Sequence, residues 1–455
     1  MTTIEDEGRR TVTLKPSGAL APWKDTRTDD ATVRPPVDVA LRAMRLEALL
    51  GDPEDPANPY GRTALASTAG AEIAAPDDVL AEIVPRADDL RGAGADRFVR
   101  VLRPLLRRDL GLGHAWAIRP MLAARAASDQ AGGIAGLLGP AALIAATGDV
   151  LHTAARIVDG LASHTPSARQ WRPTLAAAFA DLLACECLTA VALRCARPAG
   201  EGESVPVAAV GYLVPHLVGG LLADLELVLN ESGFGPETTE RKTLAALEAH
   251  RAAAGVDWTA AALRQAELVR ALPELDGFAR RVRGQGEDEQ AAAARLFTLS
   301  LPAPDGDGAC LDALAGALPG GAASLAAADG GNAATGALAR TARRLATEQR
   351  AVGRACRAAT PADPADPAAR ALADRFALVL LAAAALGVAR AVSDTGAGFL
   401  GGPDWVLLAL ERAGQRLGVP LPGHETDPRA AVWEELAERT RQGVDCDVYA
   451  TQLFW

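Results

Sequence analysis

Residues 179–234 have the sequence FADLLACECLTAVALRCARPAGEGESVPVAAVGYLVPHLVGGLLADLELVLNESGF, and this stretch decides the fold. Apolar residues recur at helical spacing on both sides of a break that is rich in Pro and Gly. Two more helices of this kind flank the stretch, and short connections join all four. Such a pattern is typical of an antiparallel helical bundle. The four predicted helices span residues 143–163, 172–197, 205–232 and 237–254.

The rest of the chain also favours helices over strands. Ala, Leu and Arg dominate the composition, aromatic residues make up 4%, and no stretch sustains an alternation of β-branched and polar residues. We therefore predict an all-α protein. The Gly-rich residues 316–331 have no strand before them, and we predict a loop there. Further helices are predicted at residues 37–50, 76–84, 96–107, 258–272, 333–359, 367–392 and 403–417.

Composition shifts divide the chain into four parts. A polar N-terminal stretch that ends in Pro35-Pro36 predicts a flexible tail, and Pro- and Gly-containing linkers separate the helical parts that follow. The predicted parts are a tail over residues 1–36, an N-terminal helical domain over 37–130, a four-helix bundle over 141–256 and a C-terminal helical extension over 257–455.

Charge and cysteine content exclude several function classes. A net charge of −11 argues against nucleic acids and anionic membranes as partners, because both attract basic surfaces. The longest apolar run, residues 376–388, is shorter than the ~20 residues of a membrane span. The six cysteines form no C-x-x-C pair and lie at no zinc-finger spacing from a histidine, so no metal is expected. The polar N-terminus and the unpaired cysteines predict a reduced, cytoplasmic location.

A polar stripe on the predicted helix 205–232 is the sharpest candidate site. Its members lie three and four residues apart, so they share one face of the helix, while the leucines between them form the core. A pair of small residues would leave room for a ligand beside the histidine. The alternative is a solvent-facing stripe that happens to hold a histidine and a glutamate. The stripe consists of Tyr212, His216, Gly219, Ala223, Glu226 and Asn230.

Two other groups carry weaker signals. Asp181 lies four residues from Cys185 and should raise the pKa of its thiol, so the packing interpretation is favoured over a nucleophile. Asp181 and Glu186 would need cationic partners inside a bundle, for which Arg172 and Arg194 are the nearby candidates. His114 follows the segment Arg107-Arg108-Asp109-Leu110 and is a candidate acid or base, with a packing histidine as the alternative.

Residues 98–126 and 179–234 resemble acyl-CoA dehydrogenases, most closely the divergent actinobacterial branch found beside polyketide and peptide biosynthetic genes. That family consists of a helical domain, a small β-barrel and a second helical domain. Here about fifteen residues separate Ala126 from Ala141, whereas a domain needs ~50 or more. The resemblance therefore implies two helical domains fused without the barrel.

The resemblance also implies a function and a weakened flavin site. The implied ligand is an acyl thioester on CoA or an acyl carrier protein in specialised metabolism. The barrel contacts to the flavin, the Arg with its Phe-Gly or Tyr-Gly pair, and the adenine-end glycine loop are absent or reduced at residues 163–171 and 230–235. No residue is a clear counterpart of the family's catalytic glutamate. We therefore expect no cofactor, with FAD bound weakly or not at all.

Two functions of different class remain open. The first is a flavin-independent enzyme with His216, Glu226, Tyr212 and His114 as acid and base candidates. The second is a non-catalytic partner of a full-length acyl-CoA dehydrogenase. Because family members associate through the second helical domain, we also expect a homodimer or a heteromer with a full-length homologue. The helix 205–232 is apolar on more than one face, which agrees with burial by neighbours.

Overall fold

The prediction of an all-α fold is confirmed. None of the described residues forms a β-strand, and an isolated bridge between Val444 and Gln452 is the closest approach to sheet structure among them. The predicted tail, except Pro35 and Pro36, and residues 127–133, half of those between Ala126 and Ala141, lie outside the description. The computed structural model describes residues 35–67, 73–84, 94–126, 134–161, 165–196, 205–276, 294–301, 309–328, 332–358, 363–394, 396 and 398–454.

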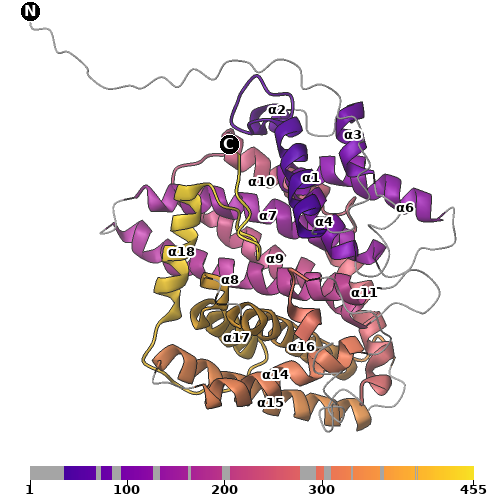
Figure 1. Ribbon diagram of the computed structural model, residues 1–455, viewed down its shortest axis with the longest axis vertical. Helices are drawn as coiled ribbons and strands as arrows, with labels where there is room; N and C mark the ends of the chain where they lie inside the picture. Colours follow the sequence, from indigo (N-terminus) through magenta and orange to yellow (C-terminus); the bar gives the residue numbers. More distant parts are fainter. Residues whose placement is uncertain are drawn as a thin grey trace, which may run out of the picture.

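The N-terminal helices lie together at one end of the molecule, the top of Figure 1. Helix α1 ends at Leu50, and the next residue, Gly51, has a positive φ of 67°, a conformation that glycine adopts without a steric cost. Helix α4 packs against α1 on one side and against α7 on the other. The elements are α1 (Pro35–Leu50), α2 (Arg62–Ser67), α3 (Asp77–Ile83), α4 (Ala95–Arg108), α5 (Leu110–Gly113), the π-helix η2 (His114–Ile118) and α6 (Arg119–Ala126).

Three long helices form the centre of the fold and pack against one another. They are α7 (Ala135–Asp159), α8 (Pro166–Cys195) and α9 (Val205–Glu231), which Figure 1 shows crossing the middle of the molecule. Helix α8 starts where Thr165 accepts a hydrogen bond from the backbone N–H of Ala168. The fourth predicted helix of this group, α10 (Thr239–His250), is shorter and touches both α7 and α9.

The C-terminal half covers the other side of α8. Helices α16 (Pro367–Ser393) and α17 (Pro403–Arg416) pack on α8, and α18 (Pro428–Gln442) returns to both α7 and α8. One continuous hydrophobic core therefore includes residues of the N-terminal helices, the central helices and the C-terminal helices. The remaining elements are α11 (Trp258–Ala271), η3 (Leu272–Asp276), α14 (Ala309–Ala327), α15 (Ala333–Ala358) and η4 (Phe399–Gly401).

The loop predicted over residues 316–331 is wrong for most of its length. Helix α14 continues to Ala327 despite Pro319 and several glycines. The reason is packing against α16. A Cβ atom on Gly321 would lie 2.6 Å from the Cδ2 atom of Leu386, so the glycine permits a close approach of the two helices. Glycine here serves the contact between helices rather than a turn.

One pair of cysteines is joined, which the sequence pattern did not predict. Cys195 at the end of α8 forms a disulfide with Cys310 in α14, 115 residues away. The other four cysteines are buried free thiols. The cytoplasmic location stays a prediction.

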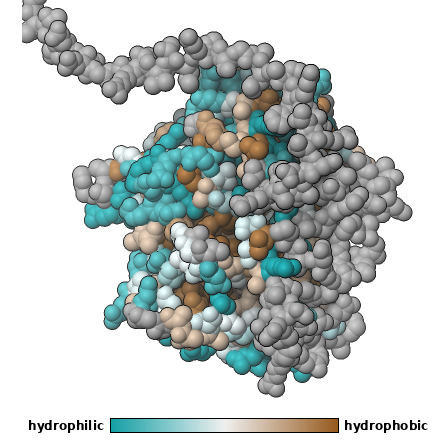
Figure 2. Space-filling view, viewed as in Figure 1, coloured by the Kyte–Doolittle hydropathy of each residue, from teal (hydrophilic) through white to brown (hydrophobic). Residues whose placement is uncertain are grey.

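Within the described ranges, five helices are long and apolar enough to cross a membrane, judged by length and composition alone. The corresponding windows are 100% buried in α8, 89% in α7, 72% in α9 and in α16, and 39% in residues 310–327 of α14. Packing between helices thus covers most of the apolar surface of four of them. On the face shown in Figure 2, hydrophilic residues surround smaller apolar patches in the middle of the view.

Candidate ligand site beside the C-terminal segment

Residues 443–454, which we call the C-terminal segment, fold back along α4 after α18 ends. Gly443 takes a left-handed conformation with φ of 63°, and the backbone N–H of Asp445 donates to the carbonyl oxygen of Thr451 at 2.8 Å. The carboxylate of Asp447 accepts hydrogen bonds from the backbone N–H and the hydroxyl of Thr451 at 2.9 and 2.5 Å. Arg439 of α18 donates to the carbonyl oxygens of Asp445 and Asp447. These bonds fix the segment as a tight turn.

A buried ionic network ties this segment to helices α1, α4 and α8. Arg103 donates to a carboxylate oxygen of Asp445 at 2.8 Å, lies 3.4 Å from a carboxylate oxygen of Asp447 and pairs with Glu186. Arg107 donates to Asp445 at 2.9 Å and to Glu47 at 2.5 Å. The side chains of all six residues are less than 10% exposed. Removal of any one of these side chains would therefore leave a buried charge with fewer partners and would destabilise the fold.

Glu186 is a buried carboxyl group of this network whose pKa the fold raises. Burial raises its pKa to about 7, and the carboxylates of Asp447 and Asp445 add to the rise against the opposing effect of Arg103. The other carboxylate oxygen of Glu186 accepts a hydrogen bond from the backbone N–H of Val448 at 3.0 Å. Burial acts in the same direction on Asp445, but Arg103 and Arg107 outweigh it and hold the pKa of Asp445 below its usual value.

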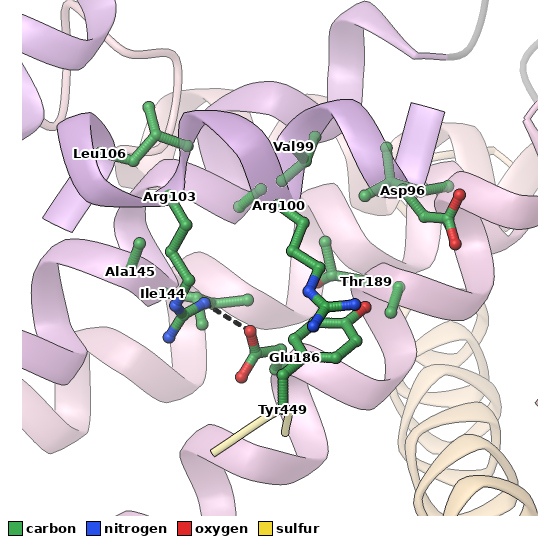
Figure 3. Close-up of a pocket in the computed structure, with 13 residues that line it drawn as sticks. Asp96, Val99, Arg100, Arg103, Leu106, Ile144, Ala145, Glu186, Thr189 and Tyr449 are labelled. Atoms are coloured by element: carbon green, nitrogen blue, oxygen red, sulfur yellow. Dashed lines mark hydrogen bonds and ion pairs between the residues drawn. The ribbon is translucent and has the colours of Figure 1, made fainter. Parts of the chain in front are cut away.

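Two cavities lie on either side of this network and share three lining residues. The smaller one, shown in Figure 3, has a volume of about 30 Å³, enough for one water molecule. It lies between α4, α7 and α8, and Glu186 and Thr189 line its floor. The shared residues are Arg100, Arg103 and Tyr449.

The larger cavity, which we call the C-terminal cavity, has a volume of about 240 Å³. Helix α1 provides an apolar wall, α4 provides a wall of arginines and Pro104, and the C-terminal segment closes the third side with Tyr449 and Phe454. The apolar residues of the α1 wall are Val39, Ala40, Ala43 and Met44. An apolar space with a few fixed polar groups is the usual form of a small-molecule site.

The polar stripe on α9 lies mainly on the surface. His216, Ala223, Glu226 and Asn230 are exposed, whereas Tyr212 and Gly219 are partly buried. The rings of Tyr212 and His216 lie 6.1 Å apart, and the indole of Trp258 meets the His216 ring edge-on at 5.2 Å. Neither of the two cavities beside the C-terminal segment is lined by Tyr212 or His216.

The structure also places the other predicted acid and base candidates, Glu226, Tyr212 and His114. Glu226 is half-exposed and pairs with Arg241 at 2.6 Å. Tyr212 shares a polar cluster with Asp374, and burial together with that carboxylate raises the pKa of Tyr212. His114 starts the π-helix η2, which packs against α3 and α7 rather than at the stripe. Burial, with Arg119 and His250 nearby, lowers the pKa of His114.

The partners predicted for the acids of α8 are wrong, although both acids do have cationic partners. Asp181 binds Arg412 and Arg416 of α17, and Glu186 binds Arg103 of α4. Arg194 instead pairs with Asp96 at 2.7 Å, and Arg172 lies over the ring of Trp433. The predicted rise in the pKa of the Cys185 thiol is confirmed, with burial as the larger cause and Asp181 as the second.

Sequence reasoning missed the C-terminal segment. The signal that could have drawn attention to it is the alternation of acidic and apolar residues in Asp445-Cys446-Asp447-Val448, shortly after Gly443.

Comparison with known proteins adds no relative: no family model, no curated protein and no solved structure matches the chain.

Proposed function

We propose that the protein binds an acyl thioester, carried on CoA or an acyl carrier protein, and does so without flavin-dependent oxidation. The observation that carries the proposal is the C-terminal cavity. The arginines of its wall, Arg100, Arg103 and Arg107 of α4, lie within residues 98–126, one of the two stretches that resemble acyl-CoA dehydrogenases. Glu186 of α8, which belongs to the same ionic network, lies within the other stretch.

The size of the cavity suits an acyl chain. An engineered cavity of ~150 Å³ holds benzene, so by proportion 240 Å³ accommodates about nine or ten non-hydrogen atoms. The three-ring isoalloxazine of FAD is larger than that, and the described residues include no β-domain to cover it. Both observations favour a ligand other than a flavin in this cavity.

The proposal is tested by a substitution whose larger side chain fills the C-terminal cavity. Ala43 lines it, and Ala48 lies on the exposed side of the same helix and does not. Binding of hexanoyl-CoA is measured by isothermal titration calorimetry for the wild type, Ala43→Phe and Ala48→Phe. We expect the Ala43→Phe variant to lose binding and the Ala48→Phe variant to keep it. Equal affinity in all three proteins would refute the proposed site, and an absorbance band of flavin in the purified protein would refute the absence of FAD.

A non-catalytic partner subunit is the second candidate function, and one observation favours it. Trp258 and Leu263 of α11 are 57% and 64% exposed, and Leu227 of α9 is 51% exposed. Exposed apolar side chains mark a protein-binding surface where they form one contiguous patch, and the two helices that carry these three residues pack against each other. Light scattering of the purified protein, alone and mixed with a full-length acyl-CoA dehydrogenase from the same organism, tests this candidate. A monomer in both samples would count against it.

A further inference from the structure

Arg100 lines the C-terminal cavity and has no anionic partner among the described residues. Its guanidinium carbon lies 3.9 Å from the centre of the Tyr449 ring. Figure 3 shows the guanidinium stacked over this ring. The stack fixes the plane of the guanidinium, while the N–H groups at its edge are directed away from the ring face. No ion pair or hydrogen bond involves this side chain within the described ranges.

The neighbouring arginines differ from Arg100 because carboxylates already engage them. Arg103 faces three carboxylates, and Arg107 faces Asp445 and Glu47. One atom of Arg103 is not engaged: its Nη2 atom is buried and has no hydrogen-bond partner among the described residues. The residue as a whole is only 7% exposed. A buried donor without an acceptor is costly. That Nη2 atom lies near Gly148 of α7, where an added Cβ atom would be 3.8 Å away, and Glu186 binds the Nη1 atom of Arg103. Within the described ranges, Arg100 is therefore the arginine of this wall whose N–H groups are available to the anion of a ligand.

We propose that the acyl group bound in this cavity ends in a carboxylate, so that the ligand is the monothioester of an aliphatic dicarboxylic acid. The inference rests on the proposed function and specifies its substrate class. The methylene chain would lie against Ala43, Met44 and Pro104, and the carboxylate would accept hydrogen bonds from Arg100. A planar carboxylate matches the two parallel N–H donors of a guanidinium. Arg100 is then a specificity-determining residue rather than a catalytic one.

Two thioesters that differ only at the far end of the chain test this proposal. Adipyl-CoA and hexanoyl-CoA have the same six-carbon chain, and adipyl-CoA adds the terminal carboxylate. By isothermal titration calorimetry we expect adipyl-CoA to bind at least about tenfold more tightly, since a hydrogen bond to a charged group contributes at least that much. Arg100→Gln should lower the affinity for adipyl-CoA at least about tenfold more than the affinity for hexanoyl-CoA, so that the preference between the two thioesters is lost. Arg45→Gln, on the exposed side of α1, is the matched control and should keep the preference.

The outcomes separate this inference from the proposed function. Equal affinities for the two thioesters in the wild type would overturn the dicarboxylate proposal and leave acyl-thioester binding intact. Absence of binding by both thioesters would refute the proposed function itself. Free CoA that binds as tightly as adipyl-CoA would also overturn the inference, because a phosphate of CoA would then be the anion. The melting temperature of Arg100→Gln shows whether the variant is folded, and a loss of affinity for hexanoyl-CoA as large as that for adipyl-CoA would also overturn the inference.

Discussion

The stripe on α9 and the network at the C-terminal segment contain the same kinds of side chain in opposite environments. At the stripe, His216 and Glu226 are exposed, and Glu226 has one arginine partner on the surface. At the C-terminal segment, Arg103 and Asp445 are 7% and 1% exposed and share several partners. Water screens the charges of the first region but not those of the second. We therefore expect changes in the second region to have much larger effects.

The largest expected effect follows the loss of Arg103. The Arg103→Ala variant leaves Glu186, Asp445 and Asp447 buried with fewer cationic partners, which should lower the free energy of unfolding by about 3–5 kcal/mol. Urea unfolding followed by circular dichroism measures this change. Arg441→Ala is the control, because Arg441 pairs with Asp159 on the surface and should change stability little. Equal losses of unfolding free energy in Arg103→Ala and Arg441→Ala would contradict the expectation that buried ion pairs contribute more to stability than exposed ones.

The next effect is a pH dependence that comes from Glu186. Its pKa is raised from 4.5 to about 7 in the folded protein, so the folded state binds the proton more tightly than the unfolded chain. Its contribution to stability is therefore complete below pH 4.5 and is lost as pH rises towards 7. Between pH 5 and pH 7 this loss amounts to about 2 kcal/mol.

Replacement by glutamine isolates this contribution from other titrating groups. Glu186→Gln keeps the shape of the side chain but cannot titrate. The difference in unfolding free energy between the wild type and Glu186→Gln should shift by that amount in favour of the variant from pH 5 to pH 7. His114 and His152 have lowered pKa values in both proteins and cancel in the difference. A difference that does not vary with pH would show that Glu186 has an ordinary pKa.

The smallest effect is expected at the stripe. His216→Ala removes an exposed ring that contacts Tyr212 and Trp258, so stability should change by less than about 0.5 kcal/mol. Binding of hexanoyl-CoA should be unchanged, because the C-terminal cavity does not include this residue. Melting temperature and calorimetry on the same sample check both points. Loss of binding with an unchanged melting temperature would make the stripe the ligand site.

Helix positions were predictable from sequence because they depend on local periodicity. The predicted helices at 258–272 and 367–392 differ from α11 and α16 by one residue at their C-terminal ends. Helix α18 was missed, and α14 was taken for a loop. The local composition of α14 does not predict a helix, because the reason for its glycine is distant in sequence: Gly321 permits a contact with Leu386, 65 positions later in the chain.

The site was less predictable because its contacts join distant parts of the chain. Spacing alone placed Tyr212 and His216 on one face, and they do lie together. It also indicated that Asp181 and Glu186 need cationic partners. Their partners lie 231 and 83 positions away, and Asp445 lies 342 positions from Arg103. No rule of local spacing predicts which arginine reaches which carboxylate at such separations.

Hydrogen–deuterium exchange with and without hexanoyl-CoA tests directly whether the ligand site lies beside the C-terminal segment. Ligand in the C-terminal cavity should slow exchange in residues 35–50 of α1 and in residues 444–454, while residues 212–231 of α9 and the start of α11 stay unchanged. Slower exchange in α9 and α11, with none in the C-terminal segment, would contradict this account and place the ligand at the stripe.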